Sequence, residues 1–274
     1  MSARELLTSL AVVVAILGLG ALTELALPLR TRTTERGRGL ANLGLTALTL
    51  AINFGLTAAA ALVALNRSPP DTGVMAWLGL PRIMQVVASI IVLDFFFGYV
   101  AHRAMHLSPT MWRVHRVHHS DPFVDVTTTY RTHPLEVLWR FTFMMVPVWT
   151  LGIPAAAVVI YRLLSALNGT LEHANIRVWA PFDRTLSLIW VTPNMHKVHH
   201  SRSQPQTDSN YGNILSVYDR VLGTFTPTEL APSVLYGLDE DSSRSTSLRA
   251  LLSLPFGTGP SDARRRRATK EVPA

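Results

Sequence analysis

Histidines provide the main chemical signal in this sequence. All ten lie between His102 and His200, and most fall in the strings HRAMH at 102–106, HRVHH at 115–119 and HKVHH at 196–200. Residues three or four apart on a helix share a face, so each string presents imidazoles at the spacing of metal ligands. Imidazole binds zinc, copper, iron and nickel alike, so the strings predict a metal site without identifying the metal.

The number of imidazoles indicates two ions. Adjacent helical residues point about 100° apart, so a histidine doublet serves two neighbouring ions, or one ion and the groups around it. Eight imidazoles are too many for one ion that keeps a position open for a reactant. The expected ligands in the three strings are His102, His106, His115, His118, His119, His196, His199 and His200. His173, in LEHAN, is added to them as a ninth.

Other polar residues near the strings are expected to hold the ligands in place through hydrogen bonds. Asp94 precedes His102 by eight positions, about two helical turns, and so is a candidate to orient a ligand. His133, in RTHPLE, is expected to position a ligand. The full set is Asp94, His133, Glu136, Asn175, Asp208, Asn210 and Tyr211. No catalytic residue is assigned beyond the metal ligands.

The elements that carry these residues are expected to be membrane helices. The chain is 48% hydrophobic and 16% charged, whereas soluble domains carry about 25% charged residues. Apolar runs at Leu6–Leu29, Ala41–Leu65 and Ile83–Ala101 have the length of about 20 residues that crosses a bilayer. The net charge of +7 is not a nucleic-acid signal, because the arginines flank apolar runs.

The arginines also predict the orientation in the membrane. Arg30, Arg32, Arg36 and Arg38 follow the first run, and basic residues concentrate on the cytoplasmic side of membrane spans. The loop at 66–82 then lies outside, and the third run ends in the cytoplasm at His102.

A helical hairpin is expected between the second and third histidine strings. The apolar stretch from Val137 to Leu171 is broken at Gly152-Ile153-Pro154. A single crossing would separate the strings by about 30 Å of hydrocarbon, whereas a hairpin returns them to the same face. Arg162 lies within this stretch, and we expect it to face protein or a polar cavity.

The chain has no cysteine. This excludes disulfides, thiolate zinc sites and cysteine-ligated iron–sulfur clusters within it. Electrons for any redox reaction must therefore come from another molecule.

Together with the histidine strings, the motifs RTHPLE, EHAN, TPNMHKVHHS, DSNYG and YDRVLGTF resemble the fatty acid hydroxylase superfamily, which includes sterol desaturases. The resemblance covers Asp94 to Phe225, and Tyr218 stands where relatives often have tryptophan. It implies a helical membrane fold, two irons in a cytosolic histidine-rich cap, and oxidation of a lipid by O₂ with an external electron donor. By this resemblance the histidines of the three strings are iron ligands, with His173 a further one.

We therefore predict an all-α, multi-span helical membrane protein with a cytosolic histidine-rich cap. Its expected segments are N-terminal spans and loops at 1–82, a fatty acid hydroxylase-like catalytic domain at 83–228, and a cytosolic linker and basic tail at 229–274. Ser247 to Phe256 is expected to form a short amphipathic helix on the membrane. The expected substrate is a hydrophobic, lipid-like molecule, and no nucleic acid partner is expected.

Three other functions are consistent with a histidine-rich metal site. A metal transporter would place its ligands within the spans. A zinc-dependent membrane hydrolase requires a general base near the metal; Glu136 and Glu172 are candidates, but the sequence has no HExxH motif. A structural metal site in a binding protein would leave the membrane hairpin without a purpose. The resemblance favours the oxygenase.

Overall fold

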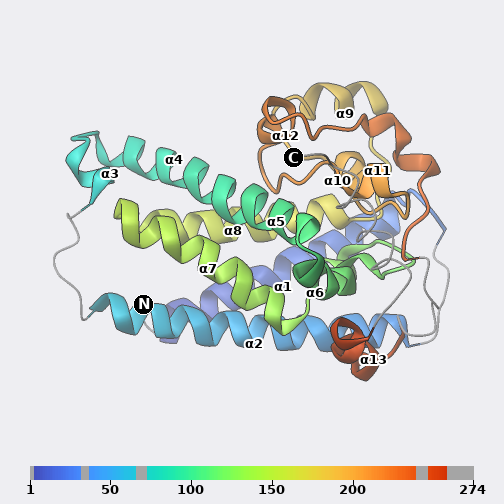
Figure 1. The fold of residues 1–274 in the computed structure, drawn as a ribbon, viewed down its shortest axis with the longest axis horizontal. Coiled ribbons are helices and arrows are strands. Elements are labelled where there is room, and N and C mark those ends of the chain that lie inside the picture. The colour runs from blue at the N-terminus through green and yellow to red at the C-terminus, as the bar shows by residue number, and fades with distance from the viewer. Residues whose placement is uncertain (1–2, 32–36, 66–72, 239–245, 258–274) are drawn as a thin grey trace.

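Long helices form a bundle, with shorter helices gathered at one end (Figure 1). The structure is a computed structural model that describes residues 3–31, 37–65, 73–238 and 246–257. Every regular element in these ranges is a helix, which confirms the all-α prediction. The long helices are α1 (Ala3–Ala26), α2 (Arg38–Leu65), α4 (Arg82–Leu93), α7 (Pro134–Leu151) and α8 (Ala155–His173).

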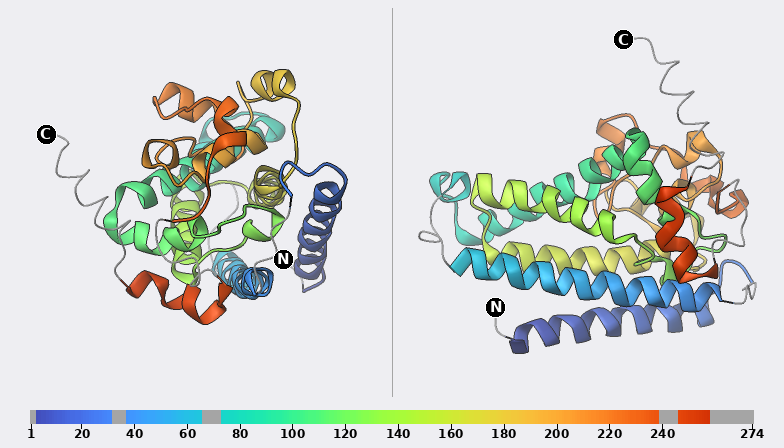
Figure 2. Two further views of the ribbon diagram at one scale, coloured as in Figure 1. Left: turned by 90° about the vertical axis from the view of Figure 1, so that its right-hand side faces the viewer. Right: turned by 60° about the horizontal axis from the view of Figure 1, so that its bottom comes forward.

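The end of the bundle with the shorter helices is called the cap here, and Figure 2 shows it from the end and from a tilted side. Its helices are α5 (Ala101–Leu107), α6 (Pro109–His119), α9 (Ala180–Leu186), α10 (Pro193–His199), α11 (Gln204–Thr207), α12 (Val217–Val221) and α13 (Leu248–Ser253). Short 3₁₀ turns η2 (Val126–Thr128), η3 (Thr228–Ser233) and η5 (Leu254–Phe256) complete it. Helix α3 (Val74–Trp77) lies at the opposite end.

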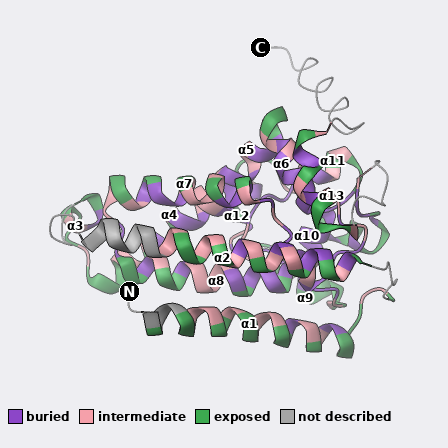
Figure 3. Ribbon diagram, turned by 90° about the horizontal axis from the view of Figure 1, so that it is seen from below, coloured by how far each residue is buried: buried purple, intermediate pink, exposed green. Residues whose placement is uncertain are grey.

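Within the described ranges, three helical segments are long and apolar enough to cross a membrane: Leu7–Ala26, Arg38–Thr57 and Arg82–Leu107. They match the three predicted runs, and α1 exposes side chains along its length (Figure 3). The third segment is longer than predicted. Helix α4 continues through a π-helical turn, η1 (Asp94–Val100), into α5, because no helix breaker occurs before Ser108-Pro109. His102 and His106 therefore lie inside this helix rather than beyond its end.

The predicted helical hairpin is formed by α7 and α8. Helix α7 ends at Gly152, whose φ of 67° is in the left-handed region, where glycine carries no steric cost. Pro154 precedes the first turn of α8. The two helices run back along each other (Figure 1), so that Glu136 near the start of α7 and His173 at the end of α8 are both at the cap.

The helices that carry the second and third histidine strings begin with the same local signal. A capping side chain accepts a backbone N–H, and a proline follows in the first turn, where its missing N–H costs nothing. Ser108 accepts from Met111 at the start of α6, and Thr192 accepts from Met195 at the start of α10. These caps fix where each helix begins and hence the direction in which its imidazoles point.

The first helix is joined to the cap by buried polar contacts. Glu24 accepts hydrogen bonds from the backbone N–H groups of Val126 (2.8 Å) and Asn175 (2.7 Å). Arg30 donates to the carbonyl of Val234 at 2.7 Å and stacks over the ring of Tyr236. The glutamate that interrupts the first apolar run is thus a connection between α1 and two cap loops.

The second helix is joined to the cap by an ion-pair network. Arg38 pairs with Asp121 at 2.5 Å and Asp125 at 3.1 Å, and all three are buried. Burial alone would raise the pKa of Asp121, but Arg131 and Arg38 outweigh it and hold this pKa below its usual range. Breaking such a buried pair typically costs about 3–5 kcal/mol.

These contacts revise the interpretation of the arginines after the first span. Arg30 and Arg38 are bound to the cap rather than simply flanking a membrane helix. Arg32 and Arg36 lie outside the described residues. So do residues 66–72 of the predicted external loop, residues 239–245 of the linker and the basic tail from 258.

The predicted helix near the C-terminal end is present as α13 and η5. Leu251 and Leu254 are buried in a cluster with Ala41, Leu45 and Val117. Arg116 donates to the carbonyl of Leu254 at 2.5 Å. The apolar face of this segment therefore packs on α2 and α6.

Candidate metal centre

Nine histidines converge in the cap and form two groups. The first, called site A, contains His102, His106, His115, His119 and His199. The second, called site B, contains His118, His173, His196 and His200. In each group one ligand atom per residue lies within 4.8 Å of all the others, and every member is buried. Each group can therefore hold a metal ion.

The two doublets are divided between the sites. On α6, His119 belongs to site A and His118 to site B; at the end of α10, His199 belongs to site A and His200 to site B. The rings within each doublet lie 5.6 Å apart and nearly perpendicular, at 89°. The helical twist thus directs neighbouring side chains to adjacent centres. This arrangement corresponds to the first of the two interpretations of the doublets.

The ring nitrogens are arranged as ligands are around a cation. In site B the Nε2 atom of His173 lies 3.1 Å from those of His118 and His196. In site A the Nε2 atom of His115 lies 3.1 Å from that of His102 and 3.2 Å from that of His119. Ligands at right angles around an ion with metal–nitrogen distances of about 2.1 Å would lie about 3.0 Å apart. The donor spacing therefore fits two metal ions.

The environment keeps the imidazoles neutral, as a metal ligand must be. Burial, reinforced by the neighbouring rings, lowers the pKa of five of these imidazoles well below the usual value for histidine. They are His118, His119, His196, His199 and His200.

The Nδ1 atoms of site A bind protein groups, which directs Nε2 inward. The Nδ1 of His102 donates to the carbonyl of Tyr211 at 2.8 Å, and that of His199 to the carbonyl of Ser209 at 2.7 Å. The further pairs are His106 with Asp208 (3.1 Å), His115 with Glu136 (3.0 Å) and His119 with Thr207 (3.4 Å).

Site B is supported differently. His173 donates from Nδ1 to the carbonyl of Gly169 at 2.6 Å. The Nδ1 atoms of His118, His196 and His200 are buried and have no hydrogen-bond partner among the described residues. The carboxylate of Glu172 lies 3.8 Å from ring nitrogens of His173 and His196. Site B therefore has fewer imidazoles and fewer groups that orient them.

A family model for fatty acid hydroxylases matches residues 86–224, which contain all nine of these histidines. The chain belongs to the fatty acid hydroxylase family. No solved structure matches it at a significant level.

Three curated proteins are each similar to between 52% and 60% of the chain. Ornithine lipid hydroxylase OlsE of Rhizobium tropici is 34% identical over 147 residues, which are 53% of this chain and 43% of that protein. Alkylglycerol monooxygenase of Homo sapiens is 32% identical over 144 residues, 52% of this chain and 31% of that one. Fatty acid hydroxylase vlmA of Lecanicillium sp is 26% identical over 179 residues, 60% and 48% respectively. The chain thus spans less than half the length of these relatives.

Some residues expected to hold the candidate ligands do so. Glu136 and Asp208 bind His115 and His106 through their carboxylates. Tyr211 binds His102, but through its backbone carbonyl, and its ring packs 5.1 Å from that of His106.

The other expected residues bind elsewhere. Asp94 accepts from the backbone N–H groups of Ile214 and Leu215, so it fixes the loop after Tyr211 rather than a histidine. His133 caps α7, and its second nitrogen lies 3.3 Å from the carbonyl of Leu252. Asn175 pairs with the backbone of Arg30. Asn210 donates to the carbonyl of Met195. The sequence predicted that these residues lie near the histidines, but it did not predict the direction in which their side chains point.

Several supporting groups were not predicted. The backbone carbonyls of Gly169 and Ser209 could not be predicted from the sequence, because every residue has a carbonyl whatever its side chain. Thr207 precedes the predicted Asp208 by one position. Glu172, considered only as the base of a hydrolase, adjoins His173 in the sequence, and this adjacency was the available signal.

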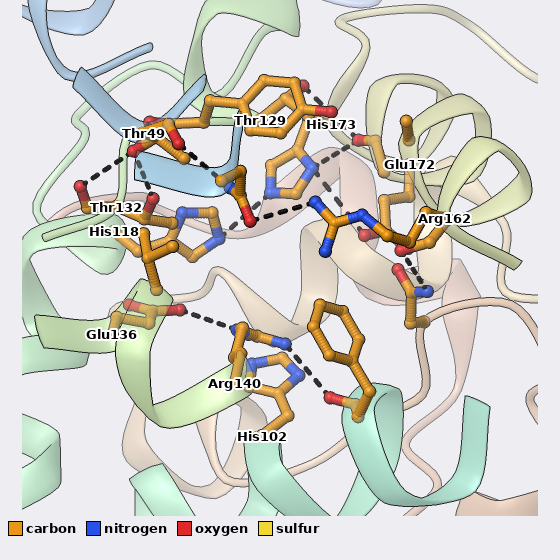
Figure 4. A pocket seen from close by; sticks show the side chains of 18 of the residues that line it. Thr49, His102, His118, Thr129, Thr132, Glu136, Arg140, Arg162, Glu172 and His173 are labelled. Carbon is orange, nitrogen blue, oxygen red and sulfur yellow. Dashed lines mark hydrogen bonds and ion pairs between the residues drawn. The ribbon is translucent and has the colours of Figure 1, made fainter. Parts of the chain in front are cut away.

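A cavity of about 140 Å³ meets both sites from the side of the long helices. His102 of site A and His118, His173 and His196 of site B line it. Figure 4 shows His102, His118 and His173 with Glu136, Arg140, Arg162 and Glu172 around it. Arg162 therefore faces a polar cavity, as predicted. A molecule in this cavity can approach both metal sites at once.

Proposed function

We propose that this protein is a di-iron, O₂-dependent hydroxylase or desaturase that acts on a lipid in the membrane. The observation that carries the proposal is one cavity lined by imidazoles of both metal sites. The similar proteins, an ornithine lipid hydroxylase and an alkylglycerol monooxygenase, support lipid oxidation.

In this proposal one iron is held by His102, His106, His115, His119 and His199, and the other by His118, His173, His196 and His200. Two irons held there and reduced by a donor would supply the chemistry that activates O₂, and nitrogen ligands suit iron. The chain itself positions the C–H bond, excludes water and orients the imidazoles. Hydroxylation converts R–H, O₂, two electrons and two protons into R–OH and water. Because the chain has no cysteine, an external donor protein supplies the electrons.

The test is isotopic labelling of lipids. A host that expresses the protein under ¹⁸O₂ should accumulate a lipid carrying one ¹⁸O atom, which is absent from a host expressing a variant with His118→Ala and His199→Ala. For desaturation, the product instead loses two hydrogens and gains no label. An iron-loaded protein that changes no lipid, or a label that comes from water, would contradict the proposal; label from water would favour a hydrolase.

We further propose that the protein crosses the membrane several times and that the cap lies in the cytoplasm. Support comes from the three apolar helical segments and from the basic residues beside the cap end of α1 and α2. A reporter fused after Phe225 should read cytoplasmic, and one inserted after Leu78, beside α3, should read external. Both reporters on the same side would rule out this topology.

A further inference from the structure

A second cavity lies beside the one at the metal sites. The first, called the inner chamber, reaches the imidazoles; the second, called the outer groove, also measures about 140 Å³ and is lined by α1, α2 and α8. Asn53, Tyr130, Arg162 and Ala166 line both cavities, so the two adjoin each other at these residues. Phe54 and Val159, at the outer groove, expose 39% and 38% of their surface on the outside of the bundle. The outer groove therefore lies between the outside of these helices and the inner chamber.

The two cavities differ in chemistry. The outer groove is lined mainly by apolar side chains, among them Leu10, Val13, Leu50, Val158 and Leu163. The inner chamber, although Phe97 and Val137 also line it, has many more groups that form hydrogen bonds or carry charge than the outer groove. Beyond the imidazoles these include Thr49, Thr132, Glu136, Arg140, Ser165, Glu172 and Asn213. A hydrocarbon chain placed against charged groups would displace the water bound to them without replacing its hydrogen bonds, and this desolvation costs free energy. The inner chamber thus suits a polar group, and the outer groove suits a chain.

Arg162 stands where the cavities meet. Its Nη2 donates to the side-chain oxygen of Asn53 at 3.0 Å, and its Nη1 lies 3.9 Å from the sulfur of Met144. No carboxylate of the described residues lies within ion-pair distance of it, whereas Arg140 is paired with Glu136 at 3.0 Å. An arginine among apolar helices without a carboxylate is expensive unless it has a functional partner. Its planar set of donors matches a carboxylate or phosphate.

We propose that Arg162, beside Asn53 and Tyr130, binds an oxyanion of an amphiphilic substrate, while the substrate's hydrocarbon chain lies in the outer groove. The proposal rests on the proposed function and names the class of its substrate: a carboxylate- or phosphate-bearing lipid. Because Arg162 and four of the histidines line one small chamber, the oxidised carbon lies on the side of the molecule that carries the oxyanion.

Binding tests this proposal without requiring turnover. The iron-loaded, full-length protein in non-ionic detergent is titrated with hexadecanoate, hexadecyl phosphate and hexadecanol, which share one chain length. We expect one of the two oxyanions to bind about ten- to a hundredfold more tightly than the alcohol, because a hydrogen bond to a charged group adds about this much to the affinity. The oxyanion that binds more tightly identifies the headgroup. Arg162→Gln should remove this preference and leave hexadecanol binding and iron content unchanged, and Arg162→Lys should retain part of it.

Control variants distinguish binding at Arg162 from binding at iron or at another cation of the cap. Arg184→Gln removes an exposed arginine that is paired with Glu229, and it should leave the preference intact. Equal preference in the wild type and Arg162→Gln would mean that the oxyanion binds iron or another group, and would overturn the proposal; so would a wild type without preference. If Arg162→Gln loses its iron through misfolding, Arg162→Lys decides, because unchanged discrimination in that variant also contradicts paired recognition by the guanidinium.

The position of the chain is tested separately. Leu163→Trp fills the outer groove and should weaken hexadecanoate binding by about tenfold while sparing hexanoate. Leu167→Trp is the matched control, because Leu167 lies one turn along α8 and does not line the groove. If both substitutions weakened hexadecanoate binding equally, the hydrocarbon chain would not lie in the outer groove. Preference for oxyanions in a protein that oxidises no lipid would contradict the proposed function but leave the binding site standing.

Discussion

Replacing either His118 or His199 by alanine is expected to lower the iron content from two ions to about one per chain and to reduce lipid oxidation by at least about a hundredfold. The two residues belong to different sites, His118 to site B and His199 to site A. Each substitution removes one donor from a buried set in which nitrogen atoms face each other, and reaction at a joint centre requires both ions. Metal analysis of the purified variants and product analysis by mass spectrometry measure the two losses.

His133→Ala is the matched control for this prediction. It removes the tenth histidine, which contacts Leu135 and Leu252 but none of the nine candidate ligands. It should retain both irons. Combining His118→Ala with His199→Ala should lower thermal stability by less than the sum of the single losses, because residues of one network couple. Full iron content in either single variant would show that the replaced residue is not a metal ligand. Strict additivity of the two losses in thermal stability would indicate two independent sites.

Removing the carboxylate of Glu136 is expected to weaken metal binding at site A by about ten- to a hundredfold. Glu136 is fully buried and accepts from His115 at 3.0 Å and from Arg140 at 3.0 Å. In Glu136→Ala the ring of His115 loses the group that orients it, and Arg140 loses its counter-charge beside the cavity. Titration of the metal-free protein with ferrous iron under argon should show one site weakened and the other retained.

Glu136→Gln separates the two roles of this carboxylate. The amide oxygen still accepts one hydrogen bond but does not neutralise Arg140. We expect it to recover most of the metal affinity lost in Glu136→Ala. Glu229→Gln, which alters an exposed pair with Arg184, should have no effect on either site. Equal iron affinity in Glu136→Ala and the wild type would show that His115 is held by the rest of the cap alone.

Much of the metal centre follows from the spacing of the histidines. Helical periodicity places His102 and His106 on one face, and the twist between adjacent residues divides His118 from His119. The hairpin was predictable because Gly152 and Pro154 interrupt an apolar stretch whose ends must meet. These features are local, so that a few consecutive residues determine them.

The groups that orient the ligands could not be predicted in the same way. His102 and His199 donate to the carbonyls of Tyr211 and Ser209, and a carbonyl leaves no trace in a sequence. Asp94 was expected to orient a ligand, but it accepts from the backbone N–H of Leu215, 121 residues away. His133 resembles a ligand by type, yet the backbone of α7 uses it as a cap. Such choices depend on tertiary contacts rather than on periodicity.

The contacts of α1 and α2 with the cap limit how the sequence can change in evolution and which segments can be exchanged with those of a relative. The segment that matches the family model begins at residue 86, whereas Glu24 and Arg38 lie before it and bind Val126, Asp121 and Asp125 within it. The matched segment is therefore not a self-contained module. A chimaera that exchanges the first two helices has to exchange the acidic partners of Arg38 with them, and the two regions are expected to change together in evolution.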